Sequence, residues 1–80
     1  MGIKNAIVFR IKELCKERKI KFNQLANDSG ITPSTVYSLL DERRKDIGVI
    51  VLKKICDGLD ISIADFFDSD MFRNLEQEIK

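Results

Sequence analysis

Residues 24–40 read QLANDSGITPSTVYSLL, and this stretch decides the fold. Its first part has the apolar spacing of a short helix over about residues 22–28, and Gly30 ends that helix because glycine readily adopts the left-handed backbone of a helix C-terminus. Thr32 is a favourable N-cap and Pro33 a favourable first residue for the next helix. The stretch therefore predicts two short helices joined by a tight turn.

The second of these helices has an outer face rich in hydroxyl groups. Val36 and Leu39 share one face, and at about 100° per residue Ser34 and Ser38 point the other way. Thr35 and Tyr37 flank that outer face. A helix of this kind, preceded by a short helix and a glycine-containing turn, is typical of a helix-turn-helix, in which the second helix enters the major groove of DNA.

The expected DNA contacts fall into two groups, base edges and backbone phosphates, according to the chemistry of the side chains. Short hydroxyl groups exchange hydrogen bonds with base edges, so we predict base contacts from Ser34, Thr35 and Ser38, while Tyr37 offers its hydroxyl to a phosphate or its ring to a sugar. The side chains that suit backbone phosphates are Lys21, Asn23, Arg43, Arg44 and Lys45. The alternative is a plain solvated helix face and loop, with Tyr37 packed at the domain edge.

The rest of the chain also has helical spacing. A helix over about residues 4–18 and another over about residues 49–59 each carry one apolar stripe. Ser62 and Asp65 form a capping-box-like pair at the start of a fifth helix. The residues expected in the core are Ile7, Ile11, Leu14, Cys15, Leu25, Ala26, Val36, Leu39, Leu40, Leu52, Ile55, Cys56, Leu59, Phe9, Phe22, Phe66 and Phe67.

The C-terminal tail, residues 69–80, is predicted to form a last amphipathic helix, since Met71, Leu75 and Ile79 recur at steps of four. Its apolar residues, with Phe72 among them, have two possible partners: their own domain or a second copy of the chain. Because a single small module contacts one half-site, we expect a homodimer with an interface at Met71, Phe72, Leu75 and Ile79.

Composition excludes several classes of protein. The 80 residues are 44% hydrophobic, which suits one compact domain. No apolar run approaches the roughly 20 residues of a membrane span, and no signal peptide is evident, so we expect a cytoplasmic protein. With two distant cysteines and no histidine, the chain is expected to hold no metal or cofactor. No glycine-rich phosphate loop, nucleophile–base pair or small-molecule site is evident, which argues against an enzyme.

Charge is unevenly distributed along the chain. Residues 1–45 hold ten Lys/Arg and five Asp/Glu, a net charge of +5, whereas residues 46–80 hold four and eight, a net charge of −4. Such a split indicates one face for an anionic partner and another kept away from it; the alternative is an ordinary solvated surface.

The stretch at 24–40, together with LKKICDGLDISIADFF at 52–67, resembles the Cro and phage-repressor-like helix-turn-helix family, often called the XRE family. The resemblance implies an all-α, compact five-helix lambda-repressor-like domain over residues 1–68, with its helix-turn-helix at about residues 22–42, followed by the tail. It further implies binding to a double-stranded DNA operator as a dimer and regulation of transcription. We expect repression, because simple promoter blocking fits a chain this small. The recognition-helix roles then fall on Pro33, Ser34, Thr35, Tyr37 and Ser38.

Three features set this chain apart from the pattern that it resembles. Ile47 stands where the family often has proline before its fourth helix. Lys21 and Phe22 stand where the family often has threonine and glutamine, so Lys21 is expected to take over the phosphate contact. Asp41 and Glu42 would repel phosphates unless they meet cytosine amino groups or pair with a neighbouring arginine. The alternative function is a protein-interaction module, antitoxin- or anti-repressor-like, on the same helical fold.

Overall fold

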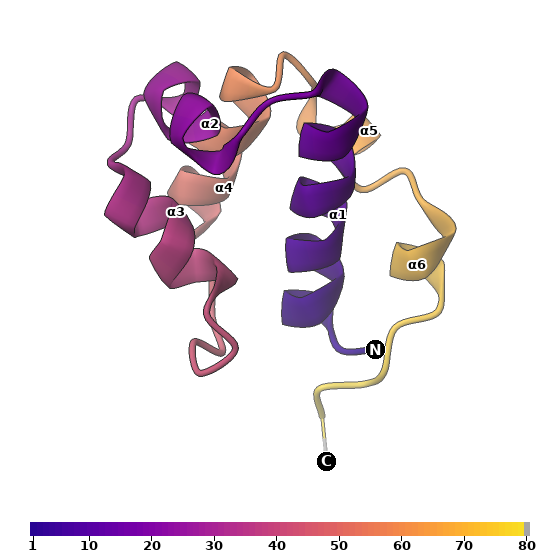
Figure 1. The fold of residues 1–80 in the computed structure, drawn as a ribbon. Helices are drawn as coiled ribbons and strands as arrows, with labels where there is room; N and C mark the ends of the chain where they lie inside the picture. Colours follow the sequence, from indigo (N-terminus) through magenta and orange to yellow (C-terminus); the bar gives the residue numbers. More distant parts are fainter. Residues whose placement is uncertain (80) are drawn as a thin grey trace.

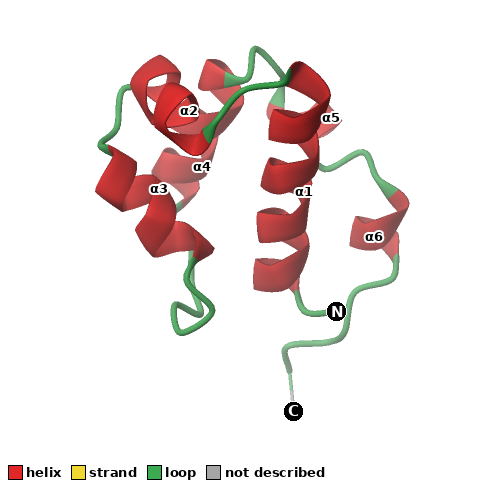
Figure 2. Ribbon diagram, viewed as in Figure 1, coloured by secondary structure: helices red, strands yellow, loops and turns green. Residues whose placement is uncertain are grey.

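The computed structural model describes residues 1–79, and all of its regular structure is helical (Figures 1 and 2). The helices are α1 (Ile3–Arg18), α2 (Phe22–Ser29), α3 (Pro33–Leu40), α4 (Val49–Gly58), α5 (Ile63–Phe66) and α6 (Asp70–Arg73). The predicted five-helix domain is therefore confirmed, and the sixth helix is a single turn in the tail. In Figure 1, α1 stands between α6 on one side and the group of α2, α3 and α4 on the other.

The ends of the helices follow the local chemistry that the sequence indicates. Gly30 closes α2 with φ 69°, and Asp60, just beyond α4, has φ 54°. Thr32 Oγ1 accepts the Thr35 N–H at the start of α3, and Ser62 Oγ accepts the Asp65 N–H at the start of α5. These caps fix where each helix begins or ends, because they satisfy N–H and C=O groups that have no partner within the helix.

The core combines the apolar stripes of α1 and α4 with side chains of α2, α3 and α5. The buried apolar residues are Ala6, Ile7, Ile11, Leu14, Cys15, Leu25, Ala26, Val36, Leu39, Leu52, Ile55, Cys56, Leu59 and Phe66. Phe22, Leu40 and Phe67 are half-buried and pack against this cluster. Burial raises the pKa of the Cys15 and Cys56 thiols, so both cysteines are protonated, apolar parts of the core.

The assignment of Phe9 to the core is wrong. Its side chain is 53% exposed. Phe9 follows Ile7 by two residues, which is about 200° around a helix, so the two side chains lie on nearly opposite faces of α1.

Two arginines of α1 are used to join helices. Arg10 donates from Nε to the Phe66 carbonyl at 2.8 Å, and Arg18 donates from Nε to the Leu59 carbonyl at 3.1 Å. Both bonds satisfy backbone oxygens close to the ends of α4 and α5. These two positive charges therefore serve the fold.

The tail does not form the long amphipathic helix that its spacing predicts. Only α6 is helical, and the backbone then turns back to the chain start, where the Glu76 N–H donates to the Met1 carbonyl at 3.1 Å. Phe72 lies 4.8 Å from Phe67 and 6.1 Å from Phe66, measured between ring centroids. Packing of one aromatic ring and contacts with the chain start outweigh helix formation here, since a helix this short is marginal by itself.

Candidate nucleic-acid interface

The start of α3 is held by a small network of hydroxyl groups. Thr32 Oγ1 lies 2.9 Å from Thr35 Oγ1 and 3.0 Å from Ser34 Oγ, in addition to accepting the Thr35 N–H. Because a hydroxyl group has one hydrogen and two lone pairs, Ser34 and Thr35 keep hydrogen-bonding capacity for another molecule. The network orients these two hydroxyls without consuming them.

The predicted base-contacting residues share one side of α3. Pro33 occupies the first helical position and is exposed, as is Ser34, while Thr35 and Ser38 are half-buried. Tyr37 is 53% exposed, and its ring packs edge-to-face on Phe22 with centroids 6.0 Å apart. Tyr37 thus packs at the domain edge and still presents half of its surface to solvent.

The acidic residue at the end of α3 is neutralised locally. Arg43 Nε and Nη2 donate to Asp41 Oδ1 and Oδ2 at 3.2 and 2.9 Å, and the Arg43 N–H also donates to Oδ1 at 2.9 Å. These bonds lower the pKa of the Asp41 carboxyl to about 2, and the carboxylate in turn raises the pKa of Arg43. Asp41 therefore pairs with a neighbouring arginine, which is one of the two alternatives that the sequence analysis gave for this residue.

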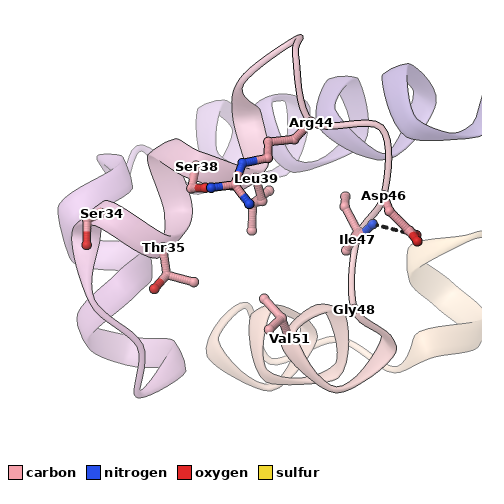
Figure 3. Close-up of a pocket in the computed structure, with 9 residues that line it drawn as sticks. All are labelled: Ser34, Thr35, Ser38, Leu39, Arg44, Asp46, Ile47, Gly48 and Val51. Carbon is pink, nitrogen blue, oxygen red and sulfur yellow. Dashed lines mark hydrogen bonds between the residues drawn. The ribbon is translucent and has the colours of Figure 1, made fainter.

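Arg44 is placed differently from Arg43. Its N–H donates to the Asp41 carbonyl at 3.0 Å, which closes a turn, and its exposed side chain reaches back over the end of α3 beside Ser38 (Figure 3). Within residues 1–79, neither Arg44 nor the exposed Lys45 forms an ion pair with a carboxylate. Both cations of the α3–α4 loop are therefore available to phosphates.

A hollow of about 490 Å³ lies between α3, this loop and the start of α4 (Figure 3). Its lining residues are Ser34, Thr35, Ser38, Leu39, Arg44, Asp46, Ile47, Gly48 and Val51. The Asp46 carboxylate accepts the N–H of Ile47 at 2.9 Å, so this negative charge is held by the backbone of the loop. The predicted hydroxyl residues and Arg44 thus share one concave surface.

Three further hollows continue this surface around the domain. One lies beside Tyr37, Ser38, Arg43 and Arg44, the next beside Tyr37, Lys21, Lys16 and Lys12, and the third beside Lys21, Lys19 and Asn23. Adjacent hollows share residues: first Ser38 and Arg44, then Tyr37, then Lys21. The carboxylates of Asp28, Asp41 and Asp46 also line these hollows. We give the name interface surface to the cationic, hydroxyl and asparagine residues of the four hollows: Lys12, Lys16, Lys19, Lys21, Asn23, Ser34, Thr35, Tyr37, Ser38, Arg43 and Arg44.

The structure places all of the predicted DNA-contacting residues on or next to this surface. Pro33 adjoins it at the start of α3, and Lys45 follows it in the loop. Sequence reasoning missed Lys12 and Lys16, which belong to α1. Their spacing of four residues, continued by Lys19, is the signal that could have identified them.

The tail residues predicted for a dimer interface lie elsewhere. Phe72 packs within its own domain, Met71 and Leu75 are half-buried, and Ile79 is 89% exposed. In Figure 1, α6 is on the other side of α1 from α3, and the segment after it passes beneath the N-terminal end of α1.

Two absences complete the description of residues 1–79. No group of three or more histidine, cysteine or acidic side chains is arranged to hold a metal ion. None of the helices in this part of the chain has both the length and the apolar character that a membrane span requires.

A short helix, a glycine turn and a second helix with an outward hydroxyl face define the helix-turn-helix class of protein. The sequence model of the Cro/C1-type HTH DNA-binding domain matches residues 10–70. The chain therefore belongs to the Cro/C1-type HTH DNA-binding domain family.

A solved structure supports the same fold. The crystal structure of the prophage Lp1 protein 11 matches with a TM-score of 0.81 and 26% sequence identity, covering 94% of this chain and 100% of that one. A search of curated protein sequences found no significant match.

Proposed function

We propose that this protein is a non-enzymatic, sequence-specific regulator of transcription that inserts α3, beginning at Pro33, into the major groove of an operator. The observation that supports this proposal is the hydroxyl face of α3, with Arg44 beside it and no carboxylate of residues 1–79 paired to that arginine. A bound domain would block access of other proteins to the promoter, so repression is the simplest outcome.

The roles within the site follow from chemistry. Ser34, Thr35 and Ser38 read base edges, with Pro33 and Tyr37 beside them against the groove wall. The phosphate contacts are made by Lys21, Asn23, Arg44 and Lys45. Arg43 contacts a phosphate only when its hydrogen bonds to Asp41 are broken.

Selection of duplexes from a random library tests this proposal. A recovered consensus motif is expected. On that motif Ser38→Ala should change which base is preferred, by about 1–3 kcal/mol for a good contact, whereas Arg44→Ala should weaken all sequences alike and reduce the salt slope by about 1. Lys54→Ala, an exposed lysine of α4 outside the interface surface, is the matched control for charge. Recovery of no motif, with no retention of any duplex at low salt, would refute the proposal.

We further propose that the protein acts as a homodimer. In this arrangement Met71, Leu75 and Ile79 contact the second copy, and Phe72 anchors the tail from beneath. Two copies would read half-sites about 34 Å apart. Light scattering should give the dimer mass at high concentration, and Ile79→Ser should shift it toward the monomer; a monomer at every concentration would exclude the dimer.

A second candidate function has one observation in its favour. Val49 and Ile50, adjacent at the start of α4, are 72% and 67% exposed, and such an apolar pair suits a protein partner. If the fold serves as a protein-interaction module, the unmodified protein should retain no DNA duplex. The double variant Val49→Ser/Ile50→Ser should then abolish binding of the protein partner.

A further inference from the structure

A lysine occupies the first position of the apolar stripe of α1. Lys4, Ile7 and Ile11 follow one another at steps of three and four residues, so the Lys4 side chain leaves the helix on the face that packs against the domain. Ile7 and Ile11 are buried, and Lys4 is half-buried. Lysine can hold such a position because its methylene stem covers apolar surface while its ammonium group reaches a polar partner.

The partner of this ammonium group is the backbone at the end of α3. Lys4 Nζ donates to the Asp41 carbonyl oxygen at 3.2 Å, which joins residues 37 positions apart in the sequence. Asp41 is the C-cap of α3, and α3 has no basic residue in its own last turn. A cation is favourable there, because the last carbonyl groups of a helix lack partners within it and form the negative end of its dipole. Lys4 therefore supplies from α1 the charge that α3 lacks.

The Asp41 carbonyl also organises the loop that follows α3. It accepts the Arg44 N–H at 3.0 Å, so Lys4 and the turn that directs Arg44 share one oxygen atom. Among the residues that the structure describes, every other hydrogen bond of residues 41–48 joins positions no more than four apart. The bond from Lys4 is therefore the one hydrogen bond in this part of the chain that ties the loop to a distant helix. Figure 1 shows the N-terminal end of α1 at the level of this loop.

A loop that is already in place binds DNA more tightly than a loop that must be ordered on binding. Fixing the backbone of a single residue lowers a binding constant by roughly five- to thirtyfold. A tether that orders the loop in the free protein removes this cost from the binding step. The tether therefore affects affinity without touching the DNA.

We propose that Lys4 is a positioning residue for DNA binding. Through its bond to the Asp41 carbonyl it holds the α3–α4 loop so that Arg44 lies beside Ser38 before DNA arrives. Lys4 itself contacts no DNA. This assignment rests on the proposed function and extends it, since it makes the affinity of the recognition surface depend on the first turn of α1.

The test compares Lys4→Met with Arg18→Met on the selected duplex. Each variant replaces a cation of α1 by an unbranched apolar side chain, and Arg18 likewise donates to a backbone carbonyl, that of Leu59, at the other end of the helix. Lys4→Met should weaken binding about tenfold. The slope of log affinity against log salt should stay unchanged, because the bound state keeps all of its phosphate contacts.

Two further results are expected from these variants. Lys4→Arg should restore most of the affinity, because a guanidinium group can donate to the same carbonyl. Arg18→Met should lower the free energy of unfolding measured in urea, without changing the affinity measured below the unfolding transition.

A double-mutant cycle shows whether Lys4 acts through Arg44. In an Arg44→Ala background, Lys4→Met should cost little more, because the side chain that it positions is gone. Additive losses would mean a general effect on the fold, and a salt slope reduced by about 0.9 would mean that Lys4 contacts a phosphate itself. Either result would overturn this assignment and leave the proposed function intact.

Hydrogen exchange of the Arg44 amide tests the tether in the absence of DNA. Exchange should be faster in Lys4→Met than in Arg18→Met, because only the first variant frees the loop. Equal rates in these two variants and the unmodified protein would exclude the tether, whatever the DNA measurements give. Failure of the unmodified protein to retain any duplex would overturn both this assignment and the proposed function.

Discussion

Arg43 and Arg44 are neighbours in the sequence and differ in availability. Arg43 forms two side-chain bonds to Asp41, whereas Arg44 extends over α3. The pKa of Asp41, at about 2, lies below the ordinary value of 3.8. A carboxyl whose pKa is lower in the folded protein than in the unfolded chain stabilises the folded loop when the pH lies above the unfolded-state pKa. This stabilisation is lost as the pH falls through the folded-state pKa. The pair is therefore fully formed at pH 7 and opens between about pH 4 and pH 2.

Titration of this carboxyl by NMR checks the pair directly. The Asp41 resonance should shift with a midpoint at about 2, and in Arg43→Ala the midpoint should rise toward 3.8 because the main hydrogen bonds to the carboxylate are lost. A midpoint near 3.8 in the unmodified protein would show that the pair does not form in solution.

Releasing Arg43 should strengthen DNA binding. Asp41→Asn removes a negative charge near the phosphates and frees a guanidinium, while the amide oxygen still accepts the Arg43 N–H that shapes the loop. Affinity should rise several-fold for all duplexes, with the salt slope steeper by about 1. Glu42→Gln is the matched control, since it removes a neighbouring charge without releasing a paired arginine. An equal gain from both variants would mean that Arg43 stays out of reach of the DNA.

At the scale of elements, the orientation of α2 depends on a close approach to the end of α4. A Cβ added to Gly58 would overlap Ser29 Oγ and lie 2.9 Å from the Ser29 backbone nitrogen. Ser29 Oγ is itself buried and has no hydrogen-bond partner among the described residues. The two helices meet here with no room for another atom, and α2 in turn supports α3.

Gly58→Ala should therefore destabilise the domain, by about 1–3 kcal/mol from overpacking, although alanine favours a helix by about 1 kcal/mol. Urea unfolding measures the loss. Ser29→Ala should be neutral or stabilising, because it removes an unsatisfied buried hydroxyl. Combined with Gly58→Ala it should recover only part of the loss, since the backbone contact remains. A neutral Gly58→Ala would show that the helices separate easily.

Helix ends were predictable from the sequence because caps are local. The capping hydrogen bonds of Gly30, Thr32 and Ser62 join residues within a few positions of each other. Pro33 acts through its own fixed φ. This chemistry can therefore be recognised without knowledge of the fold. The hydroxyl face of α3 followed from the same periodicity. These local rules account for most of the domain and for the centre of the candidate site.

Other features escaped prediction. The assignment of Phe9 to the core rests on residue type alone and ignores its position on the helix, whereas the other features depend on tertiary contacts. The tail had the spacing of a helix, but the backbone of Glu76 bonds to Met1 instead. Lys12 and Lys16 become part of the interface surface only when α1 packs beside Tyr37, and nothing in the sequence marks Gly58 as a close contact.

At the scale of the whole molecule, the charge split along the chain becomes in part a split in space, with Asp46 of the acidic half as an exception beside α3. The interface surface draws its lysines and arginines from residues 12–44, whereas α5, α6 and the segment between them carry Asp65, Asp68 and Asp70. Figure 1 shows α6 and α3 on different sides of α1. Such a dipolar domain would be turned by the field of DNA so that α3 approaches first, and the acidic side would remain outside.

The tail should matter for stability and little for the bases that one copy prefers within its half-site. Phe72→Ala removes a half-buried ring from beside Phe66 and Phe67, and should cost about 1–3 kcal/mol, less than the loss of a fully buried ring. For a domain of this size that lowers the melting temperature by roughly 4–8 °C per kcal/mol. Gln77→Ala, at an exposed position of the tail outside the proposed dimer interface, should leave the melting temperature unchanged. Below the transition, the bases preferred within a half-site should be the same for both variants, because α6, which carries Phe72, lies across α1 from α3. Equal melting temperatures for the two variants would mean that the tail does not dock, and a changed base preference in Phe72→Ala would mean that the two sides of the domain are coupled through α1.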